Sequence, residues 1–264
     1  MVNQVKNSTI HSLHTVVEAS EPKPGHLFIT FQSPEPLPEI SPGNFAEIEI
    51  PDQKEVFLRR PFSVMDADYQ NNFLSFYIKV IGKGTRALRN LKKGDTVSVI
   101  HPLGGSFSIP ENQNVLAVGG GSGIAPFPLL GKYLVKAGNR VTFLLGGRSA
   151  NDIVLVSELQ QYGKVEVTTE DGSLGHRGMV TDHPLFSGGV EGFDRIVTCG
   201  PEGMMKAVSA IAQHANIPCE VSLENLMACG FGVCLCCITP TVKGNLRVCQ
   251  EGPVFNSTEL KWND

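Results

Sequence analysis

Residues 114–147, NVLAVGGGSGIAPFPLLGKYLVKAGNRVTFLLGG, contain the pattern that decides the fold of this chain. An apolar run leads into a group of glycines, an amphipathic stretch follows, and a second apolar run ends at another glycine pair. Buried strands of parallel sheets have continuous apolar runs, and helices alternate with them along the chain. The stretch therefore predicts a strand, a helix and a parallel strand, the βαβ unit of an α/β domain.

The glycines between the predicted strand and helix are Gly119, Gly120, Gly121 and Gly123. At such a turn the backbone can approach a pyrophosphate and the helix dipole favours an anion. We therefore predict that these glycines contact a nicotinamide nucleotide. The spacing is not G-x-G-x-x-G, because Pro126 stands at the sixth position, and no acidic residue ends the second strand. A tight turn without a ligand stays the alternative, and the choice between NAD and NADP stays open.

Further segments fit the same parallel sheet: strands at 164–171 and 195–200, and helices at 151–163 and 201–215. The sequence TCGPEGMM, residues 198–205, places Cys199, Gly200 and Pro201 at the carboxyl edge of this sheet, where ligands of such domains bind. We predict that these three residues also contact the nicotinamide nucleotide. For Cys199 the alternative is a buried cysteine that closes the strand. The predicted nucleotide domain spans residues 112–216.

Before residue 112 the pattern changes to short strands of alternating polarity, separated by turns rich in proline and glycine. The predicted strands are 11–20, 26–33, 44–51, 73–81 and 95–103. This spacing is typical of a small antiparallel barrel, which we expect over residues 1–111. One helix is predicted within it, at 85–93, with Thr85 as its N-cap.

Two stretches of the predicted barrel carry groups that suit phosphates. RRPFSV, residues 59–64, supplies planar cations and a hydroxyl. YIKVIGKGT, residues 77–85, supplies Lys79 and then Gly84 and Thr85 at the start of the predicted helix. Together they indicate a barrel face that holds a dinucleotide in an extended conformation. Ordinary surface charge is the alternative for the arginine pair.

The C-terminal residues 217–264 are rich in cysteine and poor in regular pattern, so we expect a small third unit. Cys229, Cys234, Cys237 and Cys249 have the C-x4-C-x2-C…C spacing typical of plant-type [2Fe-2S] sites. Structural zinc is the first alternative, although its cysteines usually form two well-separated pairs. Thiols without metal are the second. Cys236, inside the short gap, is predicted to point away from the site as a small apolar side chain.

Composition limits the class of protein. The 264 residues include 41% hydrophobic and 18% charged residues, as in an ordinary globular protein. A formal net charge of −4 makes nucleic acid an improbable partner. No apolar stretch predicts a signal peptide or a membrane span. We therefore expect a cytoplasmic protein whose clustered thiols bind a metal rather than form disulfides.

Four motifs taken in order, RRPFS, GKGT, GGGSGIAP and CGPEGM, resemble the ferredoxin-reductase-like flavoproteins over residues 10–215. The tail narrows the resemblance, since SLENLMACGFGVCLCC followed by RVCQEGPVF is similar to the electron-transfer subunits of the NAD-linked, two-subunit dihydroorotate dehydrogenases. The stretch TTEDGSLGHRGMVTD, residues 168–182, is similar to the same subunits. The resemblance thus covers nearly the whole chain.

This resemblance implies FAD in the barrel, NAD(H) as co-substrate on the α/β domain and a [2Fe-2S] cluster in the third unit. The implied FAD contacts are Arg60, Pro61, Phe62, Ser63, Tyr77, Ile78, Lys79, Gly84 and Thr85, and the implied cluster ligands are Cys229, Cys234, Cys237 and Cys249. Two positions depart from the family pattern. Lys79 stands where the subunit usually has arginine, and His101 stands where a glycine often precedes PLG. We interpret His101 as a surface turn residue.

The resemblance also implies a partner, an FMN-containing catalytic subunit that oxidises dihydroorotate in pyrimidine synthesis, in a heterotetramer of two subunits of each kind. Electrons would pass between that partner and NAD through the cluster and FAD, and no catalytic acid or base is predicted in this chain. One alternative is a diaphorase-type FAD and [2Fe-2S] subunit of a hydrogenase, a sulfide dehydrogenase or a ferredoxin:NADP oxidoreductase. A zinc-stabilised, non-enzymatic binding module is the alternative of another class.

Overall fold

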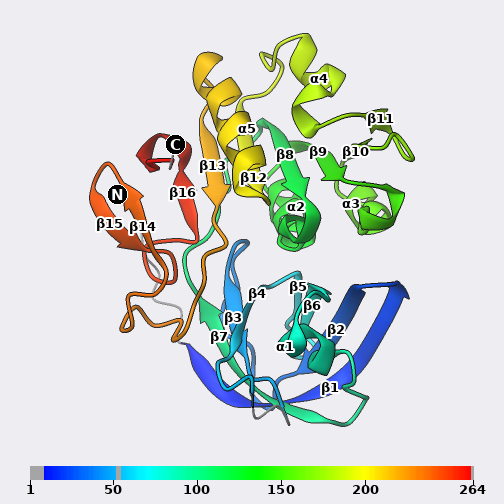
Figure 1. Cartoon of the computed structure of the whole chain (residues 1–264), viewed down its shortest axis with the longest axis vertical. Coiled ribbons are helices and arrows are strands. Elements are labelled where there is room, and N and C mark those ends of the chain that lie inside the picture. The colour runs from blue at the N-terminus through cyan, green and yellow to red at the C-terminus, as the bar shows by residue number, and fades with distance from the viewer. Residues whose placement is uncertain (1–8, 52–54, 263–264) are drawn as a thin grey trace.

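The computed structural model of the chain describes residues 9–51 and 55–262, which form two seven-stranded sheets and a separate two-stranded hairpin. Figure 1 shows the N-terminal antiparallel sheet in the lower half and the second sheet with its helices in the upper half. The cysteine-rich segment lies to one side, next to both sheets (Figure 1).

The N-terminal sheet is antiparallel throughout and has the strand order β4-β3-β7-β1-β2-β6-β5. Its strands are β1 (Ile10–Lys23), β2 (His26–Gln32), β3 (Phe45–Ile48), β4 (Arg60–Ser63), β5 (Asp66–Asp68), β6 (Phe73–Lys79) and β7 (Thr96–Leu103). Strand β4 at one edge also contacts β6 near the other edge. The sheet therefore curls around one apolar core as a half-barrel, which confirms the predicted antiparallel barrel class.

The helix predicted at 85–93 begins earlier than expected. Helix α1 spans Lys83–Leu88, and its N-cap is Gly82 rather than Thr85. The Thr85 hydroxyl still serves the helix start, because it accepts hydrogen bonds from the backbone N–H groups of Ile81 and Gly82, each at 3.0 Å. The N-cap prediction was wrong, because Gly82 has the extended backbone that an N-cap residue needs. Thr85 is instead the third residue of the helix, and its side chain bonds back to the N-cap backbone as in a capping box.

The second sheet has the order β11-β10-β9-β8-β12-β13-β16, and only β16 runs antiparallel to its neighbour. Its strands are β8 (Asn114–Gly120), β9 (Arg140–Gly147), β10 (Lys164–Thr169), β11 (His176–Arg177), β12 (Arg195–Cys199), β13 (Cys219–Ser222) and β16 (Val254–Asn256). The apolar run that opened the sequence analysis is β8 at its centre. The predicted parallel α/β architecture is confirmed.

The helices of this half are α2 (Phe127–Lys136), α3 (Val156–Gln160), α4 (Pro184–Ser187) and α5 (Glu202–His214), with 3-10 turns at Gly121–Ile124, Ala150–Asp152 and Val180–Asp182. The single helix predicted at 151–163 is wrong, because the segment forms a 3-10 turn and then α3. Between them Leu155 has a left-handed backbone with φ of 63°, and L-residues in that conformation interrupt a right-handed helix.

The C-terminal segment contributes to the second sheet as well as forming its own hairpin. Strands β14 (Ile238–Thr241) and β15 (Gly244–Arg247) pair with each other, and a 3-10 turn spans Ser257–Glu259. Strands β13 and β16, however, lie in the nucleotide-domain sheet. A division at residue 216 therefore cuts across that sheet. The three-domain division stays a prediction, and we propose the cluster module as residues 223–253 with the tail that follows β16.

Within residues 9–51 and 55–262, the buried side chains form three groups. One lies inside the half-barrel around Phe31 and Phe76, and another lies under α2 around Phe127 and Phe143. The last is shared, since Leu103 of β7 packs in the same group as residues of the parallel sheet and of the cysteine-rich segment. Each fully buried side chain of this size contributes roughly 1.5–3 kcal/mol relative to exposure. The cysteine-rich segment thus depends on its neighbours for a core.

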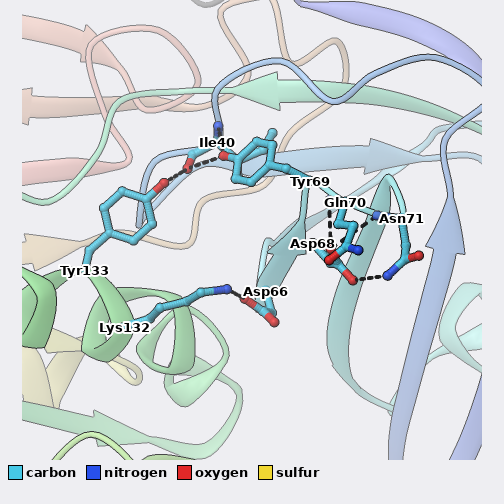
Figure 2. A network of polar contacts seen from close by, with 8 residues as sticks. All are labelled: Ile40, Asp66, Asp68, Tyr69, Gln70, Asn71, Lys132 and Tyr133. Carbon is cyan, nitrogen blue, oxygen red and sulfur yellow. Dashed lines mark hydrogen bonds and ion pairs between the residues drawn. The ribbon is translucent and has the colours of Figure 1, made fainter.

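Helix α2 is tied to the half-barrel by polar contacts (Figure 2). Lys132 Nζ lies 3.0 Å from Asp66 Oδ1, and the Tyr133 hydroxyl donates to the Ile40 carbonyl at 3.0 Å. The Ile40 N–H in turn donates to the Tyr69 hydroxyl at 2.9 Å. These contacts set the position of α2, and with it the glycine turn at its start, against the barrel.

Candidate redox site

The glycine turn after β8 and the turn after β12 touch each other. A Cβ on Gly123 would lie 2.3 Å from the Cys199 carbonyl oxygen, and one on Gly200 would lie 2.8 Å from the Gly120 oxygen. Gly119 is equally confined, because its Cβ would meet the Phe127 ring at 2.6 Å. Only glycine permits this approach. The structure therefore brings the two predicted nicotinamide-nucleotide segments to one sheet edge.

Not all of the predicted nucleotide residues reach a surface. Gly120, Gly121, Gly200 and Pro201 line a cleft of about 490 Å³ at the carboxyl edge of the sheet. Gly119 and Gly123 lie beneath it as packing residues. Cys199 has no exposed surface, and burial raises the pKa of its thiol well above the usual value. Cys199 can therefore contact a ligand only through its backbone, and its thiol is not a reactive thiolate.

Two polar residues in the cleft escaped the sequence reasoning. Glu224 follows β13, and its carboxylate is hydrogen-bonded to the side chain of Ser122 in the glycine turn. The carboxylate faces the cleft but has protein on most sides, so desolvation raises its pKa. The two residues are 102 positions apart in sequence. No local signal predicts the pair, because it exists only through the strand order β8-β12-β13.

On the half-barrel, the RRPFS and GKGT motifs lie next to each other. The Arg60 Nε lies 3.6 Å from where a Cβ of Gly84 would be. The two arginines differ in their bonds. Arg59 donates to the Ser98 carbonyl and hydroxyl, both at 2.8 Å, whereas Arg60 donates to the carbonyls of Leu58 and Arg59. Arg59 is held by neighbouring strand β7, so Arg60 is the arginine with a guanidinium available to an anion.

The β6 residues offer different groups. Tyr77 and Ile78 are 2% and 1% exposed, so only their backbone is available to a ligand. The Tyr77 hydroxyl lies 2.8 Å from His26 Nδ1. Lys79 is half-buried, lines the cleft and forms an ion pair with Asp152 at 2.8 Å. Burial alone would raise the pKa of Asp152, but the bonds from Lys79 and Ser149 outweigh it and lower that pKa.

His101 is not the surface turn residue that the sequence indicated. It lies in β7 with no exposed surface, and its Nε2 is 3.0 Å from Nε2 of the buried His14. Burial, together with the neighbouring His14, lowers its pKa to about 3. The interpretation failed because β7 extends through Leu103, and the side chain at 101 faces the inside of the half-barrel.

The four predicted cluster cysteines are brought together as two pairs. The side chains of Cys229 and Cys234 are hydrogen-bonded to each other, and so are those of Cys237 and Cys249. Backbone N–H groups also donate to sulfur at 3.4 Å, from Phe231 to Cys229, Cys236 to Cys234 and Cys249 to Cys237. Burial opposes ionisation of Cys229, but hydrogen bonds from the Cys234 and Phe231 N–H groups and from the Cys234 thiol prevail and lower its pKa to about 6.

The donor set fits the predicted cluster. A [2Fe-2S] cluster is held by four cysteine thiolates. Cys229, Cys234, Cys237 and Cys249 supply four thiols, and backbone N–H groups donate to three of the sulfurs, so these residues would hold such a cluster. Within residues 9–51 and 55–262, no group of three or more His, Cys, Asp or Glu side chains is close enough to hold a single metal ion.

The two ends of this cysteine set differ in burial. Cys237 and Cys249 are 2% and 0% exposed, and they pack in the shared core with Leu103. Cys234 is exposed at the surface. Cys236 is exposed too, so it does not pack as the small apolar side chain that was predicted.

Matches to known families extend these observations. Residues 224–261 match the model of the iron-sulfur cluster binding domain of dihydroorotate dehydrogenase B, and residues 117–210 match the oxidoreductase NAD-binding domain. Among solved structures, an NADH-dependent reduced ferredoxin-NADP oxidoreductase superposes with a TM-score of 0.85 at 34% identity, over 95% of this chain and 90% of that chain. A Neisseria gonorrhoeae ferredoxin NADP+ reductase, at 17% identity and a TM-score of 0.62, shares the fold. Fold and motifs thus define an iron-sulfur oxidoreductase with a ferredoxin-reductase-like architecture.

Curated relatives give the particular family. A protein of Clostridium acetobutylicum is 40% identical over 86% of this chain and 88% of its own length, and one of Listeria monocytogenes serotype 4b is 38% identical over 84% and 88%. Both are electron transfer subunits of dihydroorotate dehydrogenase B (NAD(+)). The chain belongs to this family of electron transfer subunits, as its motifs indicated. None of the helices in the described part of the chain has the length and apolar character to cross a bilayer.

Proposed function

We propose that this chain carries electrons between NAD and an FMN-containing dihydroorotate dehydrogenase catalytic subunit, through FAD and a [2Fe-2S] cluster, within a heterotetramer of two subunits of each kind. When bound, FAD exchanges electrons in pairs with a nicotinamide and singly with an iron-sulfur cluster. The observation that carries the proposal is the pairing of four thiols directly against the half-barrel and the parallel sheet. The chain's own residues bind and orient the three groups.

FAD is proposed to lie on the half-barrel. Its contacts would be Arg60, Pro61, Phe62, Ser63, Tyr77, Ile78, Lys79, Gly84 and Thr85. The closeness of Arg60 to Gly84 supports a pyrophosphate that contacts both residues from one side. Thr85 uses its hydroxyl to hold the α1 start, and Lys79 must share its charge with Asp152. We therefore expect Arg60 to be the principal phosphate cation.

NAD is proposed to bind across the glycine turn and the Cys199, Gly200 and Pro201 turn. The open position of Gly121, with no atom within 4 Å of its would-be Cβ, supports backbone contact with a phosphate there. Glu224 and Ser122 add a polar pair at the same edge. This pair suits an amide such as a carboxamide, which both donates and accepts hydrogen bonds.

The catalytic subunit is proposed to dock over the exposed end of the cluster loop. Apolar side chains within three positions of Cys234 are exposed, and exposed apolar patches mark interaction sites. They are Phe231, Val233 and Leu235. Beside an exposed cluster ligand, this surface supports electron exit to a protein partner rather than to a small molecule.

Reconstitution tests the proposal. The isolated chain should reduce artificial acceptors with NADH and should not oxidise dihydroorotate. Addition of the FMN-containing catalytic subunit should yield dihydroorotate-dependent NAD+ reduction. Turnover of dihydroorotate by the pure chain, or none after stable complex formation, would contradict the assignment.

A paired substitution tests the electron path. Cys234→Ala should abolish the visible and paramagnetic signals of the cluster and electron delivery to the partner, while FAD reduction by NADH stays within about threefold of wild type. Cys236→Ala is the matched control, because Cys236 belongs to neither thiol pair and should retain the cluster. Loss of FAD with unchanged iron content would contradict the assignment of cofactors to domains.

A second candidate function is a diaphorase-type subunit of another complex. The structural similarity to the NADH-dependent reduced ferredoxin-NADP oxidoreductase favours it, since that match covers 95% of this chain. The natural partner distinguishes the two candidates. Co-purification of an FMN-containing dihydroorotate dehydrogenase subunit supports the first, and co-purification of a second iron-sulfur flavoprotein supports the other.

A further inference from the structure

Two stretches of the chain supply most of the lining of the cleft of about 490 Å³, and Lys79 of β6 and residues 223–225 also line it. One wall is the glycine turn with the start of α5, at Gly120–Ser122 and Gly200–Glu202. The opposite wall is β14 with the C-terminal tail, at Ile238–Pro240 and Leu260–Trp262. A cavity of this size is typical of a small-molecule site. The predicted nucleotide residues account for only the first wall.

The second wall is a built surface. The Lys261 N–H donates to the Pro240 carbonyl at 3.1 Å, and the Val242 N–H donates to the Glu259 carbonyl at 2.8 Å. Trp262 also packs against the core shared by the parallel sheet and the cluster module. These bonds hold the tail against the hairpin, so the cleft has a fixed width on this side.

The chemistry of the two walls is complementary to a nucleotide. The first wall offers glycine backbone and the Ser122 hydroxyl, which suit phosphate and ribose. The second offers Pro240, Leu260 and the indole of Trp262, which suit the face of a planar ring, and Lys261 adds a cation beside them. A ligand with a ring at one side and an anion at the other fits this arrangement.

We propose that the nicotinamide mononucleotide half of NAD binds between both walls, with Trp262 and Lys261 of the C-terminal tail as residues of its site. This rests on the proposed NAD site and extends it to the cluster module. The nucleotide then touches the same segment that carries β14, which follows directly after the cluster ligand Cys237. A nucleotide bound in the cleft would therefore limit the movement of the cluster module relative to the nucleotide domain.

The experiment uses a property of this chain, since Trp262 is its only tryptophan. NAD+ is titrated into the flavin- and cluster-loaded protein, and tryptophan emission is recorded beside calorimetric binding. We expect saturable quenching of emission with the same midpoint as the calorimetric Kd. Nicotinamide mononucleotide should quench, and AMP should not.

Variants give a second measurement. Trp262→Ala should raise the Kd for NAD+ about tenfold, Trp262→Phe by less than threefold, and Lys261→Ala by three- to tenfold. Asn245→Ala, at an exposed residue on the same hairpin outside the cleft, is the matched control and should leave the Kd unchanged. Unaltered flavin and cluster spectra show that each variant is folded.

The outcomes separate this inference from the proposed function. Calorimetric binding of NAD+ with unchanged emission would place the nucleotide away from the second wall and overturn the inference alone. A wild-type Kd in Trp262→Ala would do the same. No NAD+ binding by the wild-type protein would overturn the proposed function and this inference with it.

Discussion

Helix α2 meets the half-barrel through one buried leucine, Leu129, and the polar side chains around it, whereas the cluster module meets the half-barrel through a larger shared apolar core. At α2 the contacts are the Lys132–Asp66 ion pair and the Tyr133–Ile40 hydrogen bond (Figure 2). At the module Leu103 packs with Cys237 and Cys249. We name these the α2 junction and the cluster junction.

The two junctions should differ in what it costs to open them. A hydrogen bond or exposed ion pair exchanges for water at about 1 kcal/mol or less. A core exposes apolar surface at about 25 cal/mol per Å² and cannot open in part without leaving a cavity. We therefore expect the polar contacts of the α2 junction to adjust around the buried Leu129 when a nucleotide enters the cleft. The cluster junction should instead keep a constant distance between the cluster and the half-barrel, which single-electron transfer requires.

Acid should destabilise the half-barrel strand that forms one side of the cluster junction. Of the predictions made here, this one has the largest expected change in the free energy of unfolding. Strand β7 holds both Leu103 and the buried His101, whose pKa of about 3 lies below the usual 6.5. A depressed histidine pKa means that its stabilisation is complete above pH 6.5 and is lost as pH falls toward 3. The loss at pH 3 is on the order of 4 kcal/mol.

Urea unfolding at a series of pH values from 7 to 4 measures this loss. The variant His101→Gln keeps an amide donor toward His14 but does not titrate, so its unfolding free energy should change less over that range. Parallel pH curves for wild type and variant would show that the histidine pair is not the source of the acid sensitivity.

Truncation of Leu103 should break the cluster junction at neutral pH. Leu103 is 4% exposed, and one of its methyl carbons lies 3.2 Å from where a Cβ of Gly230 would be, next to the proposed ligand Cys229. Leu103→Ala should lower the unfolding free energy by about 3 kcal/mol and accelerate cluster loss to a chelator. The matched control is Leu13→Ala, at a leucine 62% exposed on the same sheet, with an expected change within about 0.5 kcal/mol. Equal losses in both variants would contradict the distinction between the junctions.

Strands and motifs that show a local pattern could be predicted from the sequence. Contacts that depend on the order of strands in a sheet could not. The run at 114–120 predicted β8 because burial on both faces of a parallel strand requires continuous apolar residues. The cysteine spacing likewise predicted all four thiols that the structure pairs. The Ser122–Glu224 contact could not be predicted, since it follows from β12 lying between β8 and β13.

His101 and the domain boundary show the same limit. A histidine next to a proline and glycine suggests a turn, and only the pairing of β7 with β1 places it opposite Ile10 inside the half-barrel. The division at 216 followed a change in composition. Strand β13 nevertheless continues the parallel sheet, because its partner β12 is 20 residues earlier in the chain. A local sequence pattern predicts that a strand forms, but it does not predict which strand pairs with it.

Removal of a single hydrogen bond at the α2 junction has the smallest expected effect on stability, and it tests whether the two junctions behave independently. Tyr133→Phe removes the 3.0 Å bond to the Ile40 carbonyl and keeps the ring in place, so it should cost about 1 kcal/mol. Amide exchange near Ile40 should then be about fivefold faster, while exchange around Leu103 is unchanged. Val135→Ala is the control, because Val135 lies on the same helix and is 43% exposed. A change in NAD+ affinity in Tyr133→Phe would show that the α2 junction takes part in nucleotide binding. Faster amide exchange around Leu103 as well would show that the two junctions open as one cooperative unit, which contradicts the comparison.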